Sequence, residues 1–218
     1  MRRFLTFAMM LLLAAPASAQ NNSIHIDQIG SSNVIDITQA GSGNRVGSSL
    51  TPSTITGSGN TLTIIQTGST NQLDYNINGG TNTVSLTYTG DGNIATLNCG
   101  SNNATCSDAT VTHTITGDDN IISTTITGSD ITNTLTVNGN TNTITTTQSS
   151  NDATQTMTLT GNSNMVTASQ AGAGVHTLTM NVTGDSNTYN IAQSGAVSNS
   201  ITINTTGSSN NISVTQGN

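Results

Sequence analysis

The stretch that decides the fold runs Asn33-Val34-Ile35-Asp36-Ile37-Thr38-Gln39-Ala40-Gly41. Successive side chains of a β-strand point to opposite faces, so Ile35, Ile37 and Gln39 share one face. The other face carries Asp36 and Thr38. This alternation of β-branched and polar residues predicts a strand with one buried face, and the glycine that follows predicts a turn.

The same frame returns along most of the chain, because Gly-x-x-Asn turns separate alternating segments at a usual step of 11 residues. Glycine tolerates the positive φ angles of tight turns, and asparagine bonds readily to nearby backbone. The turn glycines that we predict are Gly30, Gly41, Gly57, Gly68, Gly79, Gly90, Gly117, Gly139, Gly161, Gly184 and Gly207, and Gly100-x-x-Asn103 is a further unit. A fixed short period indicates one structural unit that is stacked many times.

We therefore expect an all-β fold, an amyloid-like β-solenoid of stacked strand-turn-strand loops. Two halves of about 11 residues make a rung of about 22 residues, and the chain has room for about eight rungs. Inward amides at equivalent positions of stacked strands can hydrogen-bond along the stack and fix its register. The ladder residues that we predict are Asn22, Gln28, Asn33, Gln39, Asn60, Gln66, Asn71, Asn82, Asn93, Asn120, Asn142, Gln148, Asn164, Gln170, Asn187, Gln193, Asn210 and Gln216.

The first 19 residues lie outside the repeat and have the layout of a secretory signal peptide. Arg2 and Arg3 precede an apolar run, and Ala17-Ser18-Ala19 forms a cleavage site of small residues. The apolar run is too short to span a bilayer. We therefore expect two parts, a signal peptide over 1–19 and a repeat β-solenoid over 20–218, in a secreted protein.

The repeat region carries little charge for its length. It has no Lys, Glu or Trp, and one Arg against ten Asp gives a formal charge of −9. Nothing in this composition neutralises phosphates, which disfavours nucleic acids and anionic membranes as partners. The apolar residues keep step with the glycines, which argues against a disordered polar chain.

Neither end of the repeat carries a pattern that caps a strand edge. The inward frame begins at Asn22 and Ile24, and it runs on to Val214 and Gln216. Open strand edges recruit further strands, and a low charge suits stacking because stacked like charges repel. We therefore expect the chain to polymerise end to end with copies of itself.

Two insertions interrupt the period. The step from Gly41 to Gly57 is five residues longer than usual and contains Pro52, and the step from Gly100 to Gly117 is six residues longer. We expect both to be loops extruded at turns. Cys99 and Cys106 flank the second insertion, and in an exported protein we expect a disulfide between them, with two reduced inward cysteines as the alternative.

No catalytic or metal-binding constellation emerges from the spacing of the polar residues. His113 and His176 fall on the inward face and His25 on the outward face, and none has a Ser, Cys or carboxylate at the spacing of a site. The aspartates sit mainly in turns, where this residue type is favoured on conformational grounds. We expect no enzymatic activity and no cofactor.

Five of these residues carry a resemblance to a known family. Asn22, Gln28, Gly30, Asn33 and Gln39 are spaced like the curlin repeat of bacterial curli subunits. The resemblance implies a secreted amyloid fibre subunit, or fimbria component, of the biofilm matrix that supports cell adhesion and surface colonisation. It also implies self-assembly, a nucleator subunit and an outer-membrane export pore as partners, and an extracellular fibre at the bacterial cell surface.

Two other functions compete with the fibre. Outward threonines could form the flat array with which some solenoids bind ice or another surface: Thr112, Thr114, Thr116, Thr132, Thr134, Thr136, Thr154, Thr156 and Thr158. Asp36, Asp74, Asn76 and Ile121 interrupt the threonine positions. A glycan-binding or host-binding adhesin is the third possibility, for which the sequence offers no aromatic platform.

Overall fold

The structure, a computed structural model, describes residues 21–100 and 106–217 of the chain. The predicted signal peptide and Asn103 lie outside the described residues. Within the described part, no helix is long and apolar enough to cross a membrane.

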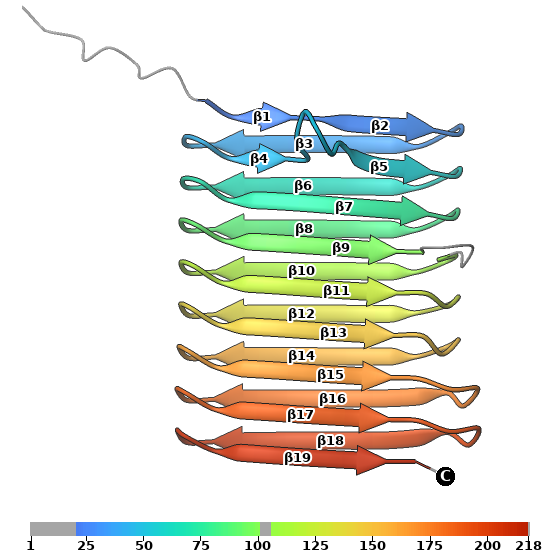
Figure 1. The fold of residues 1–218 in the computed structure, drawn as a ribbon, viewed down its shortest axis with the longest axis vertical. Helices are drawn as coiled ribbons and strands as arrows, with labels where there is room; N and C mark the ends of the chain where they lie inside the picture. Colours follow the sequence, from blue (N-terminus) through green and yellow to red (C-terminus); the bar gives the residue numbers. More distant parts are fainter. Residues whose placement is uncertain (1–20, 101–105, 218) are drawn as a thin grey trace, which may run out of the picture.

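The described chain is a stack of β-strands joined by short turns (Figure 1). The strands are β1 (Ser23–Ile24), β2 (Ile26–Ile29), β3 (Val34–Ala40), β4 (Arg45–Val46), β5 (Ser53–Thr56), β6 (Thr61–Thr67), β7 (Gln72–Asn78), β8 (Thr83–Thr89), β9 (Ile94–Cys99), β10 (Thr110–Thr116), β11 (Ile121–Ile126), β12 (Thr132–Asn138), β13 (Thr143–Gln148), β14 (Thr154–Thr160), β15 (Met165–Gln170), β16 (His176–Thr183), β17 (Thr188–Gln193), β18 (Asn199–Thr206) and β19 (Asn211–Gln216).

These strands form two parallel sheets that face each other. Sheet A contains β1, β2, β4, β5 and the odd-numbered strands from β7 to β19, and sheet B contains β3 and the even-numbered strands from β6 to β18. The chain crosses from one sheet to the other at every turn, so each strand pairs with the strand one full circuit away. Thr132, for example, is paired with Thr154, which makes a rung of 22 residues. The chain is thus a parallel β-solenoid of about eight turns, as its periodicity predicts.

The alternation predicted from the sequence sets which side chains fill the space between the sheets. In β8, Val84, Leu86 and Tyr88 are buried, and Ser85 and Thr87 between them face outward. The same positions of neighbouring rungs join into one hydrophobic cluster that runs along the stack. Each rung contributes only a few apolar side chains, so the backbone ladder and the buried amides must supply much of the specificity.

The first insertion lies where we did not expect it. Val46 pairs with Leu73, and Thr54 pairs with Asn76, so residues 47–52 leave sheet A in the middle of a strand row and return to the same row. Ser48 N donates to Thr51 O over 3.0 Å and closes this loop. The prediction of a loop at a turn is therefore wrong here. Because β4 and β5 both stay paired with β7, the insertion leaves the ladder on either side intact.

The second insertion does lie at a turn, between β9 and β10. Residues 101–105 are outside the described part. Cys99 and Cys106 flank the insertion and form a disulfide, and both side chains are fully buried.

Candidate functional site

A column of stacked asparagines follows the edge where sheet B turns into sheet A. Its members are Asn22, Asn44, Asn71, Asn93, Asn120, Asn142, Asn164, Asn187 and Asn210. All of them except Asn44 are among the predicted ladder residues. Asn44 also follows a glycine in a Gly-x-x-Asn unit, so the sequence carried its signal.

One member shows how the column is bonded. Asn120 Nδ2 donates to Asn93 Oδ1 over 3.0 Å and to Gly139 O over 2.8 Å. Its Oδ1 accepts from the backbone N and from Nδ2 of Asn142, both over 3.0 Å. The side chain is fully buried, and each polar atom has a partner. A buried amide that lost these bonds would cost about 1–3 kcal/mol, so the column fixes which rungs stack on which.

The opposite turn edge begins in the same way and then changes. Asn33, Asn60 and Asn82 bond to one another as the long column does. The positions that follow along the stack are Ala109, Ile131, Ala153, His176 and Asn199. The amide ladder at this edge is therefore short, and apolar side chains replace it in the middle of the stack.

The predicted glutamines divide into two short ladders. Gln39 Nε2 donates to Gln66 Oε1 over 2.7 Å in sheet B. In sheet A, Gln148 donates to Gln170 and Gln170 donates to Gln193, each over 3.0 Å, and Gln216 is paired with Gln193 in the backbone register. Gln28 belongs to neither ladder, because its Nε2 donates to Gly30 O in its own turn.

Two amides in the core were not among the predicted ladder residues. Asn133 Nδ2 donates to Gln148 Oε1 of the facing sheet over 2.9 Å and to Gln155 Oε1 of the next rung over 3.1 Å. Both Asn133 and Gln155 are buried. The alternation places Asn133 on the same face as Leu135, so this signal was present in the sequence.

The turn glycines adopt the conformation that their role requires. The predicted turn glycines from Gly30 to Gly207 all have φ between 104° and 151°. At Gly117, a Cβ would lie 2.2 Å from the carbonyl oxygen of Gly139 in the next rung. The same carbonyl accepts the Asn120 amide, so a glycine in this column both permits the close approach and supplies a ladder acceptor.

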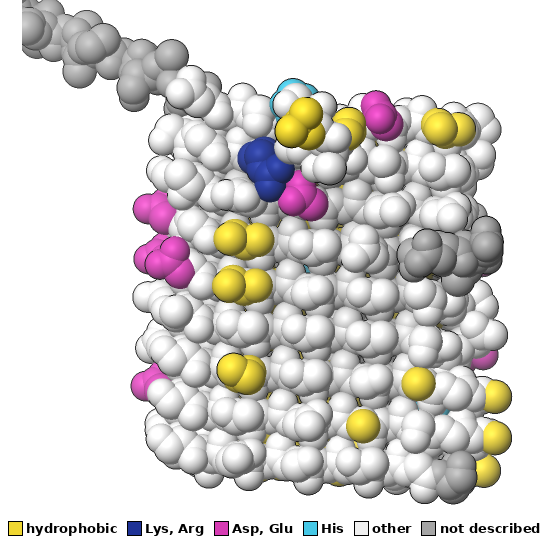
Figure 2. Space-filling view, in the orientation of Figure 1, with side chains coloured by type: hydrophobic (Ala, Val, Ile, Leu, Met, Phe, Trp, Pro, Cys, Tyr) yellow, Lys and Arg dark blue, Asp and Glu magenta, His cyan; other side chains and the backbone are white. Residues whose placement is uncertain are grey.

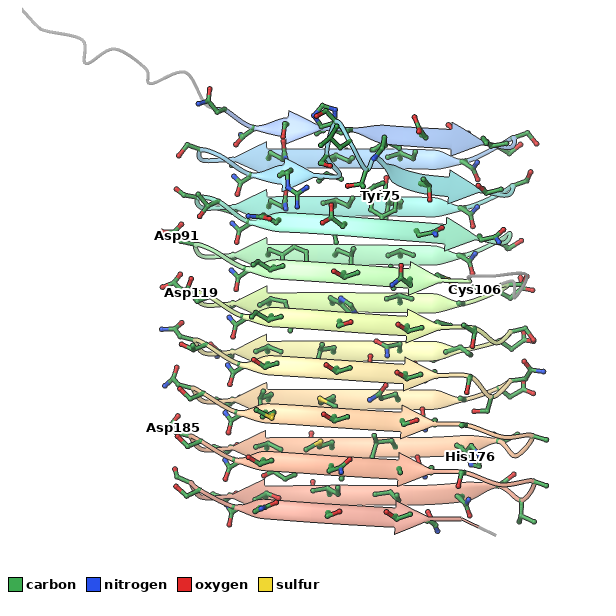
Figure 3. The ribbon with its side chains drawn as sticks, in the orientation of Figure 1. Tyr75, Asp91, Cys106, Asp119, His176 and Asp185 are labelled. Atoms are coloured by element: carbon green, nitrogen blue, oxygen red, sulfur yellow. A yellow bond between two sulfur atoms is a disulfide. The ribbon has the colours of Figure 1, made fainter. Side chains whose placement is uncertain are left out.

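A second, solvent-exposed ladder runs along the outside of the same turns. Asp118 Oδ1 accepts from Asp91 N over 2.8 Å, and Asn140 Oδ1 accepts from Asp118 N over 2.8 Å. Asn162 and Asp185 continue the chain of acceptors. The turn aspartates therefore satisfy backbone N–H groups of the neighbouring rung. Figure 3 shows Asp91, Asp119 and Asp185 on this edge, opposite Cys106 and His176.

The two inward histidines, His113 and His176, make hydrogen bonds only to neighbouring groups of the fold. His113 Nε2 lies 3.0 Å from Thr124 Oγ1, and burial lowers the pKa of His113 to about 4. His176 Nε2 donates to Ala171 O over 2.8 Å. His25 is half-buried beside the first insertion. Burial also raises the pKa of the Tyr88 hydroxyl well above its usual range.

The outer face of sheet B is a regular array of threonines. Thr112, Thr134 and Thr156 are directly paired, as are Thr114, Thr136 and Thr158. In the sheet B strands from β6 to β18, no outward position carries a charged residue. Asp74, Asn76 and Ile121, which the sequence suggested as interruptions, lie on sheet A. Asp36 lies on sheet B, but in its first strand.

Both ends of the described stack leave strand edges unpaired. Sheet A ends in β1 with β2 and in β19, and sheet B ends in β3 and in β18. No described residue donates to Asn210 Oδ1, and Gln216 Oε1 is shielded from solvent without a partner. Ile24 belongs to the inward column of Val46 but is 48% exposed, because no described strand covers it. Each end therefore shows an unfinished rung.

The surface offers little else that resembles a site. A shallow depression of about 250 Å³ lies beside the first insertion, and Pro52, Asp74 and Asn76 contribute to its lining. Arg45 pairs with Asp74 over 3.0 Å at its edge. Within the described residues, no three His, Cys or Asp side chains gather as metal ligands would. Most of the face in Figure 2 is uncharged and polar.

Searches for similar proteins found no matching family model, curated protein or solved structure.

Proposed function

We propose that the chain is the structural subunit of an extracellular amyloid-like fibre, assembled end to end by copies of itself. The observation that carries the proposal is the pair of unfinished ends. Asn210 presents an amide oxygen without a partner at one end, and Ile24 presents an inward apolar side chain at the other.

The physical argument is that an open strand edge binds another strand. Unpaired N–H and C=O groups in a row form a template for β-pairing, and stacked identical amides strengthen it. A second copy supplies strands of the same period, with asparagines and glutamines at the same positions. The outward side chains of the end strands carry few charges that would oppose the contact.

The likeness of Asn22, Gln28, Gly30, Asn33 and Gln39 to the curlin repeat extends the proposal to a biological setting. On that basis the chain is exported with the help of residues 1–19 as a signal peptide. The fibre then lies at the bacterial cell surface and contributes to biofilm matrix and adhesion. A nucleator subunit and an outer-membrane export pore are the partners that this setting implies.

Incubation of the chain from Gln20 onward tests the proposal. We expect fibres that bind thioflavin and give a cross-β reflection at about 4.8 Å. Val214→Asp places a charge on the inward side of β19, where the side chain is only half-buried in a single copy. It should block growth while the single copy still folds. Ser213→Asp on the exposed side of the same strand is the matched control.

Growth of Ser213→Asp with arrest of Val214→Asp is the expected pattern. A chain that stays monomeric at high concentration with its β-structure intact would contradict the fibre. Equal growth of both variants would show that the β19 edge is not the growing surface.

The threonine array favours a second candidate, the binding of ice or another regular surface. Its columns are set by strand pairing, so the hydroxyl groups repeat at about 4.8 Å along the stack. Thermal hysteresis in a persistently monomeric sample would support this function. Thr136→Tyr in the array should then abolish the activity, and Thr145→Tyr on the exposed face of sheet A should not.

A further inference from the structure

The two sheets of the described chain do not contain the same number of strand rows. Sheet B has eight strands, and each is one row. Sheet A has 11 strands, but β1 with β2 forms a single row and β4 with β5 forms another, which leaves nine rows. Residues 21–217 therefore make an odd number of half-circuits, because both the first and the last row lie in sheet A.

This odd number gives each end of the stack a step. At one end the row of β1 and β2 projects beyond β3, and at the other end β19 projects beyond β18 (Figure 1). Each end thus has one projecting row in sheet A and one recessed row in sheet B.

We infer that successive copies in the fibre are related by a half-turn about the long axis, so that sheet A of one copy continues as sheet B of the next. The inference rests on the proposed end-to-end assembly and specifies its contact. The row of β1 and β2 of the incoming copy pairs with the recessed β18, and its β3 pairs with the projecting β19. Strand direction is preserved, because a half-turn about the stack axis exchanges the directions of the two sheets.

The residues that meet in this register match in type. Gly30 stacks on Gly207 and Asn33 stacks on Asn210, so the two turns coincide. Both turns have the same backbone shape, with φ of 127° at Gly30 and 129° at Gly207, and 58° at Ser32 and 60° at Ser209. The inward side chains that meet are Ile24 on Ile201, Ile26 on Ile203, Ile35 on Ile212, Ile37 on Val214 and Gln39 on Gln216.

The same register completes the unfinished long ladder. From Asn44 to Asn164, each Asn of the column accepts two bonds at Oδ1 from the Asn of the next rung and donates to the glycine carbonyl of the next turn. Asn210 lacks all three contacts among the described residues. Asn33 of the incoming copy supplies the two donors, and Gly30 supplies the carbonyl. Gly207 also has open space where other turn glycines meet the next carbonyl, and Gly30 fills it.

Stacking without the half-turn leaves a defect. The row of β1 and β2 would then pair with β19, and Asn22 would stack on Asn210. The incoming β3 would stand two row spacings from β18, about 9.6 Å, with no strand between them. The inward side chains of β18, including Ile201 and Ile203, would stay uncovered. The half-turn is the arrangement that leaves no row missing in either sheet.

Pyrene excimer emission separates the two registers. Thr215 of β19 faces outward, next to Thr38 of the neighbouring copy with the half-turn and next to Asp27 without it. Cysteines introduced at these exposed positions can be labelled selectively, because Cys99 and Cys106 are buried in a disulfide. The test compares fibres of pyrene-labelled T38C/T215C with fibres of pyrene-labelled D27C/T215C.

We expect a several-fold higher ratio of excimer to monomer emission in T38C/T215C fibres than in D27C/T215C fibres, and a loss of the excimer on dilution with unlabelled chains. Fibres with the opposite ratio, or with equal ratios, overturn the half-turn while the fibre proposal stands. A failure of the unlabelled chain to form fibres overturns both.

Electron microscopy of unmodified fibres gives a second readout that needs no substitution. The half-turn predicts an advance of about 41 Å per copy, since each copy adds eight and a half rungs at about 4.8 Å. The loop over residues 47–52 projects from sheet A, so it should appear on alternate sides of the fibre. A loop on the same side of every copy would refute the half-turn.

Discussion

At the residue scale, the long asparagine column is the main feature that fixes which rungs stack on which. The members from Asn44 to Asn187 are buried and each is bonded to both neighbours, so a single truncation affects three rungs. The opposite turn edge shows that alanine is accepted at an equivalent position where the stacked neighbours make no amide ladder, as at Ala153 between Ile131 and His176. The cost of an alanine therefore depends on the column that it interrupts.

Asn142→Ala should lower the free energy of unfolding by about 1–3 kcal/mol, because it removes the acceptor of the Asn164 backbone N and Nδ2 and one of the two donors to Asn120 Oδ1. Urea denaturation followed by circular dichroism measures the change. Asn190→Ala, at an exposed outward position of β17, is the matched control and should be nearly neutral. Equal stability of the two variants would show that the column contributes little.

His113 should make the fold sensitive to mild acid. Burial lowers its pKa to about 4, against about 6.5 in the unfolded chain. Above pH 6.5 both states are neutral at this residue. Between pH 6.5 and pH 4 the unfolded state binds a proton that the folded state does not, so stability falls, by up to about 3 kcal/mol at pH 4.

His113→Leu tests this prediction, because Leu86 and Leu135 occupy the same column in the adjacent rungs. The variant should lose less stability than the original chain between pH 6.5 and pH 4 in the same urea experiment. Parallel curves for the two proteins over that range would mean that another group is responsible.

At the element scale, the strand row that contains β4 and β5 is the one that tolerates an interruption. Residue 46 pairs with residue 73 and residue 54 with residue 76, so the row needs one residue between Val46 and Ser53. The loop supplies six residues where one would span the gap. The hydrogen bonds on both sides are kept, which explains how an insertion can sit inside a strand row.

Deletion of residues 48–52 should therefore leave the fold intact and the melting temperature unchanged or slightly raised, since Gly47 alone then bridges β4 and β5. Thermal melting by circular dichroism measures this. Deletion of Thr136 alone is the control, because a one-residue shift moves the rest of β12 to the wrong face. Unfolding after the loop deletion would show that the loop itself holds the row together.

The elements also show what a sequence can and cannot reveal. Alternation around Ile35 and Ile37 was enough to predict strands, their inward faces and the stacked rungs, because side-chain direction in a strand is local. The position of the first insertion was not predictable, since Val46 and Ser53 belong to one row only through pairing with β7. The separation of Thr136 from Asp74 onto different sheets likewise depends on which half-rungs stack.

The candidate site was predictable in part for the same reason. Gly-x-x-Asn units predict the long column, because the same turn residues recur at the same place in each rung. The cross-sheet amide contact of Asn133 with Gln148 depends on how the two sheets face each other, which periodicity alone does not specify.

At the scale of the whole molecule, most acidic side chains lie at the turns, where they oppose assembly only weakly. Figure 2 shows acidic groups at both turn edges and a few on the sheet face, one of them beside the basic group. In the outer ladder, Asp91 and Asp118 are stacked in adjacent rungs, so like charges lie close together. Joining many copies multiplies this repulsion, because the fibre places every acidic edge along its length.

Fibre growth should therefore quicken as pH falls from 7 towards the aspartate pKa of about 4. Seeded thioflavin kinetics measure the rate, and seeding separates growth from changes in the stability of the free chain. Added salt at neutral pH screens the same charges and should act in the same direction. Growth rates that change with neither pH nor salt would show that charge repulsion does not limit assembly.

The loop over residues 47–52 has a practical consequence. Leu50 at its tip is 92% exposed, and the rows on both sides remain paired whatever the tip contains. A foreign peptide grafted between Ser48 and Thr51 would be displayed without entering the core. Polymerised chains would then display the grafted peptide at regular intervals, which makes the molecule a scaffold for arranging enzymes or antigens along a filament.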